Sequence, residues 1–237
     1  INPSIINQEN FYFKDLIEIK NIDFSYNDEN RVIKVFDNAN MKIKKGDMVG
    51  IIGETGSGKS TLIDIILGLL DASKGDVLVD NINIKNNKKG WNNLIGYVPQ
   101  TVFLNDESLA DNIYFYQDKK KRDQLKLSDS IKQAQLEKFV NSLPDGINTI
   151  IGEQGQRLSG GQRQRIGIAR SIYRDAEILI FDESTNSLDQ TTEKSFLRDI
   201  VNFKQKKTII MISHKLSTLE NCNKIFEVKN LKINQLK

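Results

Sequence analysis

Residues 53–61 read Gly-Glu-Thr-Gly-Ser-Gly-Lys-Ser-Thr, a spacing of glycine, lysine and hydroxyl side chains that suits a phosphate chain. The run follows the apolar residues 49–52 and precedes the helix-like residues 62–70. Glycines let backbone N–H groups wrap a phosphate, and the start of the following helix adds unpaired N–H donors. Lys59 supplies a cation for the terminal phosphates, and the Ser60 hydroxyl is placed to bind Mg²⁺.

A glycine-rich turn that binds nothing is the alternative, but strand, loop and helix together favour a site for a nucleoside triphosphate. The loop residues predicted to contact the nucleotide are Gly53, Thr55, Gly56, Ser57, Gly58, Lys59, Ser60 and Thr61.

Two further predicted strands end near polar side chains that suit the same ligand, which in an open α/β sheet lies at the carboxyl ends of the strands. Residues 94–98 lead to Gln100, whose amide offers an oxygen to Mg²⁺; a surface glutamine is an equal alternative from that position alone. Residues 208–213 lead to His214, the only histidine. A lone histidine is usually structural, but its place at this edge favours a γ-phosphate contact.

The apolar strand at residues 178–181 delivers two adjacent carboxylates, Asp182 and Glu183. Buried carboxylates are costly unless a cation or hydrogen-bond donors receive them. Asp182 continues the strand and suits Mg²⁺, directly or through water. Glu183 points to the other side and is placed to deprotonate the attacking water, with a helix N-terminal role as the alternative. Tyr26 ends an early strand, either as a platform for base stacking or as a plain strand tyrosine.

These assignments give a predicted catalytic set and a predicted metal set. The catalytic residues are Glu183, His214, Lys59 and Gln100, and the metal ligands are Ser60, Gln100 and Asp182.

The composition excludes several other classes. The chain has 237 residues, a net charge of +3 and a 38% hydrophobic fraction, enough for one large α/β domain. Both charge signs are abundant, so no nucleic acid is predicted as a partner, and the basic run at 119–122 reads as solvated. The single cysteine, Cys222, allows no internal disulfide. Neither a signal peptide pattern nor a run of about 18 apolar residues is present.

The order of predicted elements indicates the fold class. Residues 16–26, 32–43 and 76–84 favour an antiparallel section, and the later short apolar strands alternate with helices at 161–173 and 192–203. Residues 109–143 have helical composition and few strand signals surround them. We therefore expect an α/β fold: a P-loop NTPase core with a mostly parallel sheet, an N-terminal antiparallel β section and an inserted helical subdomain at about 103–170.

A second anion-suited segment is unexplained by a simple one-site ATPase. Residues 158–163 read Leu-Ser-Gly-Gly-Gln-Arg and precede the predicted helix. Glycines and a hydroxyl at a helix start suit a phosphate. This argument does not identify the molecule or the chain that would supply the phosphate.

Together these residues resemble the nucleotide-binding domain of an ATP-binding-cassette (ABC) transporter over about residues 16–228. The most specific piece is the family signature at 158–162, which occurs at the position that the family pattern requires relative to 53–61 and 178–183. The resemblance implies that Tyr26 stacks on adenine, that Gln100 senses Mg²⁺ and the membrane subunit, and that Asp189 lies at a dimer contact. Glu183 becomes the catalytic carboxylate and His214 the switch histidine.

The resemblance also implies a partner. Ser159, Gly160 and Gly161, with Gln162 beside them, would contact the γ-phosphate of ATP bound on a second nucleotide-binding domain, so that a two-fold homodimer encloses two ATP molecules.

The stretch before the signature reads Ile151-Gly152-Glu153-Gln154-Gly155 and resembles that of exporter-type members of the family. This resemblance implies that Glu153 lies near the transmembrane coupling helices. The chain begins with Ile1, and we expect residues 1–15 to be a linker from an N-terminal transmembrane domain on the same polypeptide. Residues 16–237 would be the nucleotide-binding domain, at the cytoplasmic side of the inner membrane.

Two departures from the family pattern are visible. Asn186-Ser187-Leu188-Asp189 replaces Ser-Ala-Leu-Asp, and no glycine marks a turn after the last strand. Neither removes a catalytic group, so the resemblance implies a competent ATPase.

Other functions fit less well. A chromosome-maintenance ATPase of the superfamily needs a long coiled coil between Gln100 and Leu158, and a translation factor needs two cassettes. A kinase or GTPase leaves the signature unexplained. Residues 216–225 are similar to the tail of bacterial exporters of lipid-linked sugars, with lipid or peptide cargo as equal alternatives.

Overall fold

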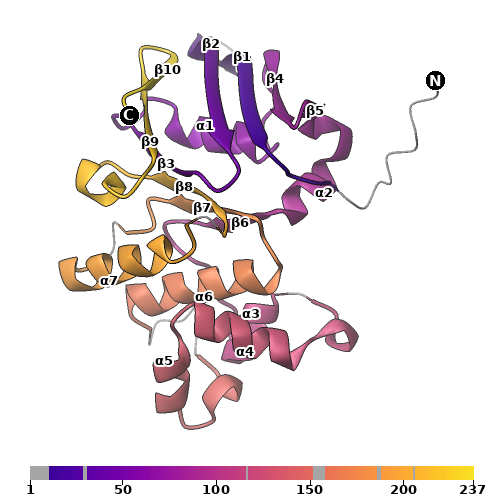
Figure 1. Ribbon diagram of the computed structural model, residues 1–237, viewed down its shortest axis with the longest axis vertical. Coiled ribbons are helices and arrows are strands. Elements are labelled where there is room, and N and C mark those ends of the chain that lie inside the picture. Colours follow the sequence, from indigo (N-terminus) through magenta and orange to yellow (C-terminus); the bar gives the residue numbers. More distant parts are fainter. Residues whose placement is uncertain (1–10, 29–30, 116, 152–157, 186–187, 205) are drawn as a thin grey trace.

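The computed structural model describes residues 11–28, 31–115, 117–151, 158–185, 188–204 and 206–237. Two β-sheets form its upper half in Figure 1, and most of the helices lie below them. The first sheet is antiparallel and holds, in spatial order, β2 (Arg31–Lys44), β1 (Leu16–Asp28), β4 (Lys74–Val79) and β5 (Ile82–Asn83). The second holds β10 (Lys232–Gln235), β9 (Lys224–Lys229), β3 (Met48–Ile52), β8 (Thr208–Ile212), β7 (Ile178–Asp182) and β6 (Ile95–Val98).

The second sheet is parallel from β9 to β6, and only β10 runs antiparallel to its neighbour. The carboxyl ends of β3, β8, β7 and β6 therefore meet at one edge. The predicted α/β fold, with an antiparallel section before a mostly parallel sheet, is confirmed.

Seven helices in the described residues surround these sheets. They are α1 (Lys59–Ile66), α2 (Lys88–Asn93), α3 (Leu109–Tyr114), α4 (Gln124–Gln133), α5 (Glu137–Ser142), α6 (Gly160–Tyr173) and α7 (Gln190–Val201). Helix α1 lies between the two sheets, whereas α6, α7 and the smaller helices α3–α5 lie across the second sheet from it (Figure 1).

Alternation along the strands creates two hydrophobic cores. On β7, Ile178 and Ile180 face the core that contains α1, and Leu179 and Phe181 face the core of the helical side. Because successive side chains of a strand point to opposite faces, the next residue, Asp182, continues on the face of α1. The alternation thus aims a carboxylate toward the helix that begins at the phosphate loop.

The helix predicted at residues 62–70 is shifted in the structure. Helix α1 begins at Lys59 and ends at Ile66, because Gly68 adopts a φ of 72° and breaks the helical path. Leu69, which lies beyond the end of this helix, is 68% exposed.

The helical segment predicted at residues 109–143 forms three short helices. Phe115 ends α3 with a φ of 41°, and Gln135 follows α4 with a φ of 57°. Asp123 starts α4 by accepting hydrogen bonds from the N–H groups of Leu125 and Lys126. Together with α6 these helices form the inserted helical section.

The strand pair β9–β10 was not predicted. Its turn consists of Asn230 and Leu231, both at positive φ (50° and 63°), so the hairpin forms in a left-handed turn without glycine. Asp37 N–H donates to the carbonyl of Leu231, which joins this hairpin to β2.

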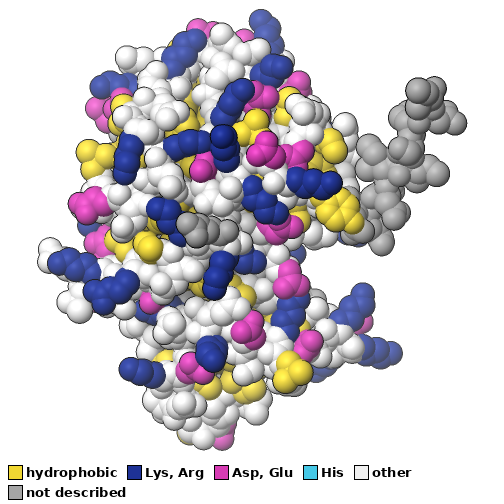
Figure 2. Space-filling view, viewed as in Figure 1, with side chains coloured by type: hydrophobic (Ala, Val, Ile, Leu, Met, Phe, Trp, Pro, Cys, Tyr) yellow, Lys and Arg dark blue, Asp and Glu magenta, His cyan; other side chains and the backbone are white. Residues whose placement is uncertain are grey.

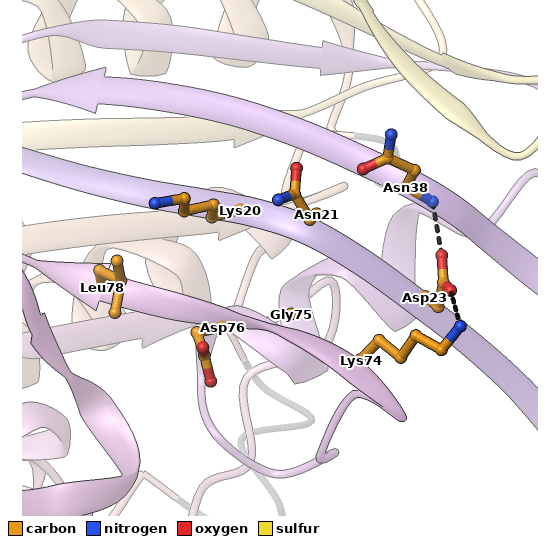
Figure 3. A pocket seen from close by; sticks show the side chains of 8 residues that line it. All are labelled: Lys20, Asn21, Asp23, Asn38, Lys74, Gly75, Asp76 and Leu78. Carbon is orange, nitrogen blue, oxygen red and sulfur yellow. Dashed lines mark hydrogen bonds and ion pairs between the residues drawn. The ribbon is translucent and has the colours of Figure 1, made fainter.

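A shallow pocket marks an irregularity where β1 pairs with β4 (Figure 3). Gly75 has a φ of 81°, and a Cβ there would lie 2.3 Å from the carbonyl oxygen of Lys20. Asp23 in this pocket accepts a hydrogen bond from the N–H of Asn38 and pairs with Lys74, at 2.6 and 3.7 Å. The Asp23 carboxylate is thus paired within the sheet.

The visible surface carries both charge signs. On the face in Figure 2, basic and acidic side chains are interspersed rather than gathered by sign. None of the helices in the described part of the chain combines the length and apolar character that a membrane crossing requires.

Candidate functional site

The phosphate loop connects β3 to α1, and its glycines are required by the backbone. Gly56 and Gly58 have φ values of 80° and 108°, which side chains rarely allow. A Cβ on Gly53 would lie 2.6 Å from Ser57 Oγ and 2.7 Å from the carbonyl oxygen of Val228. Each of these glycines therefore avoids either a strained φ or a close contact that a side chain would create.

The start of α1 is open to an anion. Gly58 is its N-cap and offers no side-chain acceptor, and the first turn contains no acidic residue. The unpaired N–H groups and positive dipole end of the helix thus meet no protein acceptor from a capping side chain. Ser57 Oγ is buried without a hydrogen-bond partner among the described residues. A phosphate in this cradle would satisfy such groups, so the residues present fit a nucleoside triphosphate.

Lys59 lies across the loop. Its side chain is only 6% exposed, and Nζ donates to the carbonyl oxygens of Gly53 (2.8 Å) and Glu54 (2.9 Å). Burial lowers the pKa of Lys59, while the nearby carboxylates of Glu183 and Asp182 act to raise it. The ammonium group of Lys59 therefore contacts the loop carbonyls and interacts with the charges of the two carboxylates.

Tyr26 lies beside the first turn of α1. Its hydroxyl and that of Thr61 are hydrogen-bonded at 3.1 Å, and the ring of Phe24 packs edge-on at 5.0 Å. The ring of Tyr26 remains 44% exposed. Ser60 and Thr55 are also exposed at this loop. The structure thus gathers the first group of predicted nucleotide contacts around one helix start.

Asp182 and Glu183 diverge at the end of β7. Asp182 Oδ2 accepts a hydrogen bond from the Tyr97 hydroxyl at 2.8 Å. Burial raises the pKa of Asp182, the Tyr97 hydrogen bond opposes that rise, and the charge of Glu183 adds to it. Glu183 has a φ of 47°, an unusual value for a residue with a Cβ, and this kink turns its side chain away from the strand direction.

The kink brings Glu183 to His214. Glu183 N–H donates to the carbonyl of Ile212 at the end of β8, and Glu183 Oε1 lies 2.5 Å from His214 Nε2. The imidazole is partly exposed, with 36% of its side chain accessible. The two residues thus form a carboxylate–imidazole pair between neighbouring strands.

Gln100 lies two residues beyond β6 with an exposed side chain. Its carbonyl oxygen accepts a hydrogen bond from Gln164 Nε2 at 2.8 Å, which ties this loop to α6. Among the described residues, no hydrogen bond joins the Gln100 side chain to Asp182 or Ser60. The structure brings the Gln100 loop to the same sheet edge without a direct contact to the predicted metal ligands.

The signature forms the start of α6. Ser159 is the N-cap: its Oγ accepts from the N–H of Gln162 at 3.2 Å, and Gln162 Oε1 accepts from the N–H of Ser159 at 2.9 Å. Gly161 packs against α7, where an added Cβ would lie 2.6 Å from Thr192 Cγ2. Leu158 is buried and anchors the segment, while Ser159 stays exposed. No described hydrogen bond or ion pair links the signature to the phosphate loop of its own chain.

Asp189 starts the neighbouring helix α7. Its Oδ1 accepts from the N–H groups of Thr191 and Thr192, and Oδ2 accepts from the Thr192 hydroxyl at 2.5 Å. These hydrogen bonds lower the pKa of Asp189. The starts of α6 and α7 therefore lie side by side and present exposed polar groups.

Within the described residues, no group of three or more His, Cys, Asp and Glu side chains is arranged to hold a metal alone. The predicted ligands Ser60, Gln100 and Asp182 offer few protein oxygens, which fits a hard cation that arrives with phosphate oxygens of its own.

Two residues near this site were missed from the sequence. Tyr97 contacts Asp182 directly, and Asp64 on α1 has its pKa raised by burial and by the charge of Asp182. The alternation of β6 could have assigned a face to Tyr97, but the register with β7 that brings it to Asp182 is not visible in the sequence.

Several predicted features lie outside the described residues. These are the start of the linker at residues 1–10, the exporter-like Glu153 within 152–157, and the altered pair Asn186-Ser187.

The fold and the loop define a P-loop NTPase with a helical insertion that carries a second anion-suited helix start. Comparison with known proteins specifies the family. The sequence profile described as ABC transporter matches residues 36–186. The chain therefore belongs to the ABC transporter family.

Relatives and a solved structure agree with this assignment. The chain is 36% identical over 219 residues to the ABC transporter B family member 6 of Dictyostelium discoideum, covering 90% of this chain and 32% of that protein. It is also 36% identical to the ATP-dependent lipid A-core flippase of Desulfotalea psychrophila, over 93% of this chain and 38% of the flippase. A bacterial Atm1-family ABC exporter with ATP bound superposes with a TM-score of 0.84 and 28% identity, over 97% of this chain and 40% of that chain.

The chain thus spans about a third of the length of the curated relatives that it matches.

Proposed function

We propose that this chain is the ATP-driven motor domain of an ABC exporter. The observation that carries the proposal is the contact of Glu183 with His214 at the sheet edge that also holds the loop of Lys59. The three residues come from segments far apart in the sequence, and their strands are neighbours in the order β3-β8-β7. A structural role alone does not require a buried lysine, two carboxylates and an imidazole at one edge.

The nucleotide is proposed to lie along residues 53–61 with its phosphates over the start of α1. Lys59 exchanges its two carbonyl partners for phosphate oxygens. Tyr26, held beside Thr61, offers its exposed ring to the adenine. Ser60, Asp182 and the side chain of Gln100 are the proposed ligands of Mg²⁺, which when bound withdraws negative charge from the phosphate oxygens.

Glu183 is the proposed general base. It accepts a proton from water as the water oxygen bonds to the γ-phosphorus and the bond to the bridging oxygen of ADP breaks. His214 holds the Glu183 carboxylate and offers a contact to the γ-phosphate. The kinked backbone of Glu183 separates its carboxylate from that of Asp182, so the two adjacent residues serve different roles.

The partner is proposed to be a second copy of this domain. The exposed Ser159, with Gly160, Gly161 and Gln162, would close over the γ-phosphate bound on that copy. Two features support this arrangement: the Ser159 side of α6 is open, and no described bond connects it to the phosphate loop of its own chain. ATP would then hold the homodimer together.

A transmembrane domain on the same polypeptide is proposed to precede residue 16 and to place the motor at the cytoplasmic side of the inner membrane. The relatives extend far beyond the length of this chain, and one of them is named as a lipid A-core flippase. A lipid-linked cargo is therefore proposed for this protein, with lipid-linked sugar, lipid and peptide as the classes to compare. The short helices α3–α5 between Gln100 and Leu158 distinguish the chain from chromosome-maintenance relatives, which carry a coiled coil there.

The test is the variant Glu183→Gln in this chain. Removing the proton acceptor should lower phosphate release at least about 100-fold, the lower bound for loss of a general base, while ATP still binds. Phosphate release and fluorescent-ATP binding are measured on the same samples. The matched control is Glu220→Gln, an exposed glutamate outside the site. Hydrolysis within tenfold of the parent chain would remove Glu183 as the base.

A further inference from the structure

Tyr97 connects the edge strand β6 to the carboxylate of Asp182. On β6 the neighbours Gly96 and Val98 are buried toward α6, and a Cβ on Gly96 would lie 2.4 Å from Ser171 Cβ. Tyr97 therefore points to the opposite face, that of α1. Its register partner on β7 is Ile180, two residues before Asp182, and its hydroxyl reaches along the strand to donate to Asp182 Oδ2 at 2.8 Å.

The sheet does not need this hydrogen bond to hold β6 in place. β6 and β7 are already paired in register over four residue pairs, from Ile95 with Ile178 to Val98 with Phe181. Tyr97 is 41% exposed, so core packing restrains its side chain little. The best-defined contact of this side chain is therefore the one that its hydroxyl makes with the carboxylate.

The bond has a consequence for the carboxylate. A carboxylate at a strand end rotates about its last torsion unless a partner fixes one oxygen. With Oδ2 engaged by the Tyr97 hydroxyl, Oδ1 is the oxygen left to accept a further partner. Hydrogen bonds to charged acceptors are among the stronger ones, so the restraint is substantial.

We propose that Tyr97 is a positioning residue that orients the Asp182 carboxylate for a phosphate-bound divalent cation. The proposal rests on the proposed function, in which Asp182 binds Mg²⁺. Tyr97 itself touches neither nucleotide nor metal; it acts through Asp182, in the way that partners outside a metal's own ligand set orient its ligands.

The experiment measures metal affinity directly. The chain carrying Glu183→Gln is loaded with ATP and titrated with Mn²⁺, and the free ion is followed by electron paramagnetic resonance. Tyr97→Phe in this background should weaken Mn²⁺ binding by more than about twofold and by up to about 100-fold, the upper cost of losing a partner that orients a metal ligand. The midpoint of urea unfolding in the absence of nucleotide should stay close to that of the parent.

The matched control is Tyr12→Phe, which removes the same hydroxyl from a side chain that is 64% exposed and outside the site. It should leave Mn²⁺ affinity unchanged. Mn²⁺ affinity within twofold of the parent for Tyr97→Phe, or tighter binding, would overturn the proposal.

A third variant, Asp182→Asn, separates this proposal from the proposed function. Weaker Mn²⁺ binding by Asp182→Asn with no effect of Tyr97→Phe would refute the role of Tyr97 alone. Unchanged binding by Asp182→Asn would refute Asp182 as a metal ligand, and the role of Tyr97 with it.

Discussion

Single residues of this site are arranged for a ligand rather than for the stability of the empty domain. Lys59 is buried with two carbonyl partners, and burial lowers its pKa. Asp182 has its pKa raised by burial, with a second carboxylate beside it. Glu183 keeps a φ of 47°. Each of these features is unfavourable by itself, and a ligand with anionic phosphates for Lys59 and a bound divalent cation for the carboxylates would relieve the electrostatic ones.

Asp182→Asn should stabilise the nucleotide-free domain at pH 7 by on the order of 1 kcal/mol. The pKa of Asp182 is raised in the folded state above the ordinary value of 3.8, so folding takes up a proton between these two values. The unfavourable charge is fully present above the raised pKa and vanishes as the pH falls through 3.8. The gain from the variant should therefore shrink on acidification.

Urea unfolding of both proteins at neutral pH and near pH 4 measures this difference. The exposed Asp145→Asn is the control and should show no such pH dependence of the difference. A gain that stays constant across the pH range, or a loss of stability at neutral pH, contradicts the expectation.

At the residue scale, the sequence predicted which side chains belong to the site better than it predicted the contacts between them. It predicted that Lys59, Asp182, Glu183 and His214 gather at one edge, because glycine spacing and strand ends are local patterns. It did not find Tyr97, whose contact with Asp182 depends on the β6–β7 register. The roles of these residues stay predictions until the variants are measured.

At the scale of elements, the phosphate loop depends on backbone conformation more than on side chains. Gly56 and Gly58 both have positive φ, but their surroundings differ. A Cβ on Gly56 would meet nothing within 4 Å, whereas one on Gly58 would lie 2.6 Å from Val35 Cγ1 on β2. The loop is thus closed against the antiparallel sheet at one glycine and open at the other.

These two glycines give a matched pair of variants. Gly56→Ala should lower the free energy of unfolding by about 1–2 kcal/mol, the penalty of a side chain in the left-handed region. Gly58→Ala incurs a similar penalty and about 1–3 kcal/mol more, because its methyl group overlaps Val35. Chemical denaturation of the two variants and the parent measures both values. Equal losses in the two variants would mean that the contact with β2 does not constrain the loop.

Helices and strands were predicted well where the hydrophobic pattern of the sequence is strong. They were predicted poorly where residues with positive φ determine the end of a helix or a turn. Strands β3, β7 and β8 are largely apolar and appear where expected. The split of residues 109–143 into three helices follows from Phe115 and Gln135 at positive φ, which composition does not reveal. The β9–β10 turn at Asn230 and Leu231 was missed for the same reason, since it contains no glycine.

At the scale of the whole molecule, the chain holds two anion-suited helix starts that lie on different sides of the second sheet. Helix α1 packs in the core between the sheets, and α6 packs in the core of the helical side. Arg165 on α6 pairs with Asp199 on α7 at 2.6 Å, which connects the signature helix to its neighbour. If the start of α1 holds the ATP of its own chain, as proposed, the start of α6 is left for a second copy, which favours a site completed by a partner.

Mixing two defective chains tests whether the signature acts on the partner. Lys59→Ala disables the phosphate loop and Ser159→Arg blocks the signature, so each homodimer should be inactive. In a mixed dimer, one site combines an intact loop with an intact signature. Random pairing makes half of the dimers mixed, and each mixed dimer has one intact site out of two. An equal mixture should therefore recover about a quarter of the parent ATPase rate if sites act independently.

The control mixes Lys59→Ala with Glu183→Gln, whose defects both lie on the loop side. Every site then carries one defect, and no activity should return. Recovery in this control, or a Lys59→Ala and Ser159→Arg mixture as inactive as each chain alone, would contradict a composite site, because complementation requires that the two defects lie on opposite sides of one nucleotide.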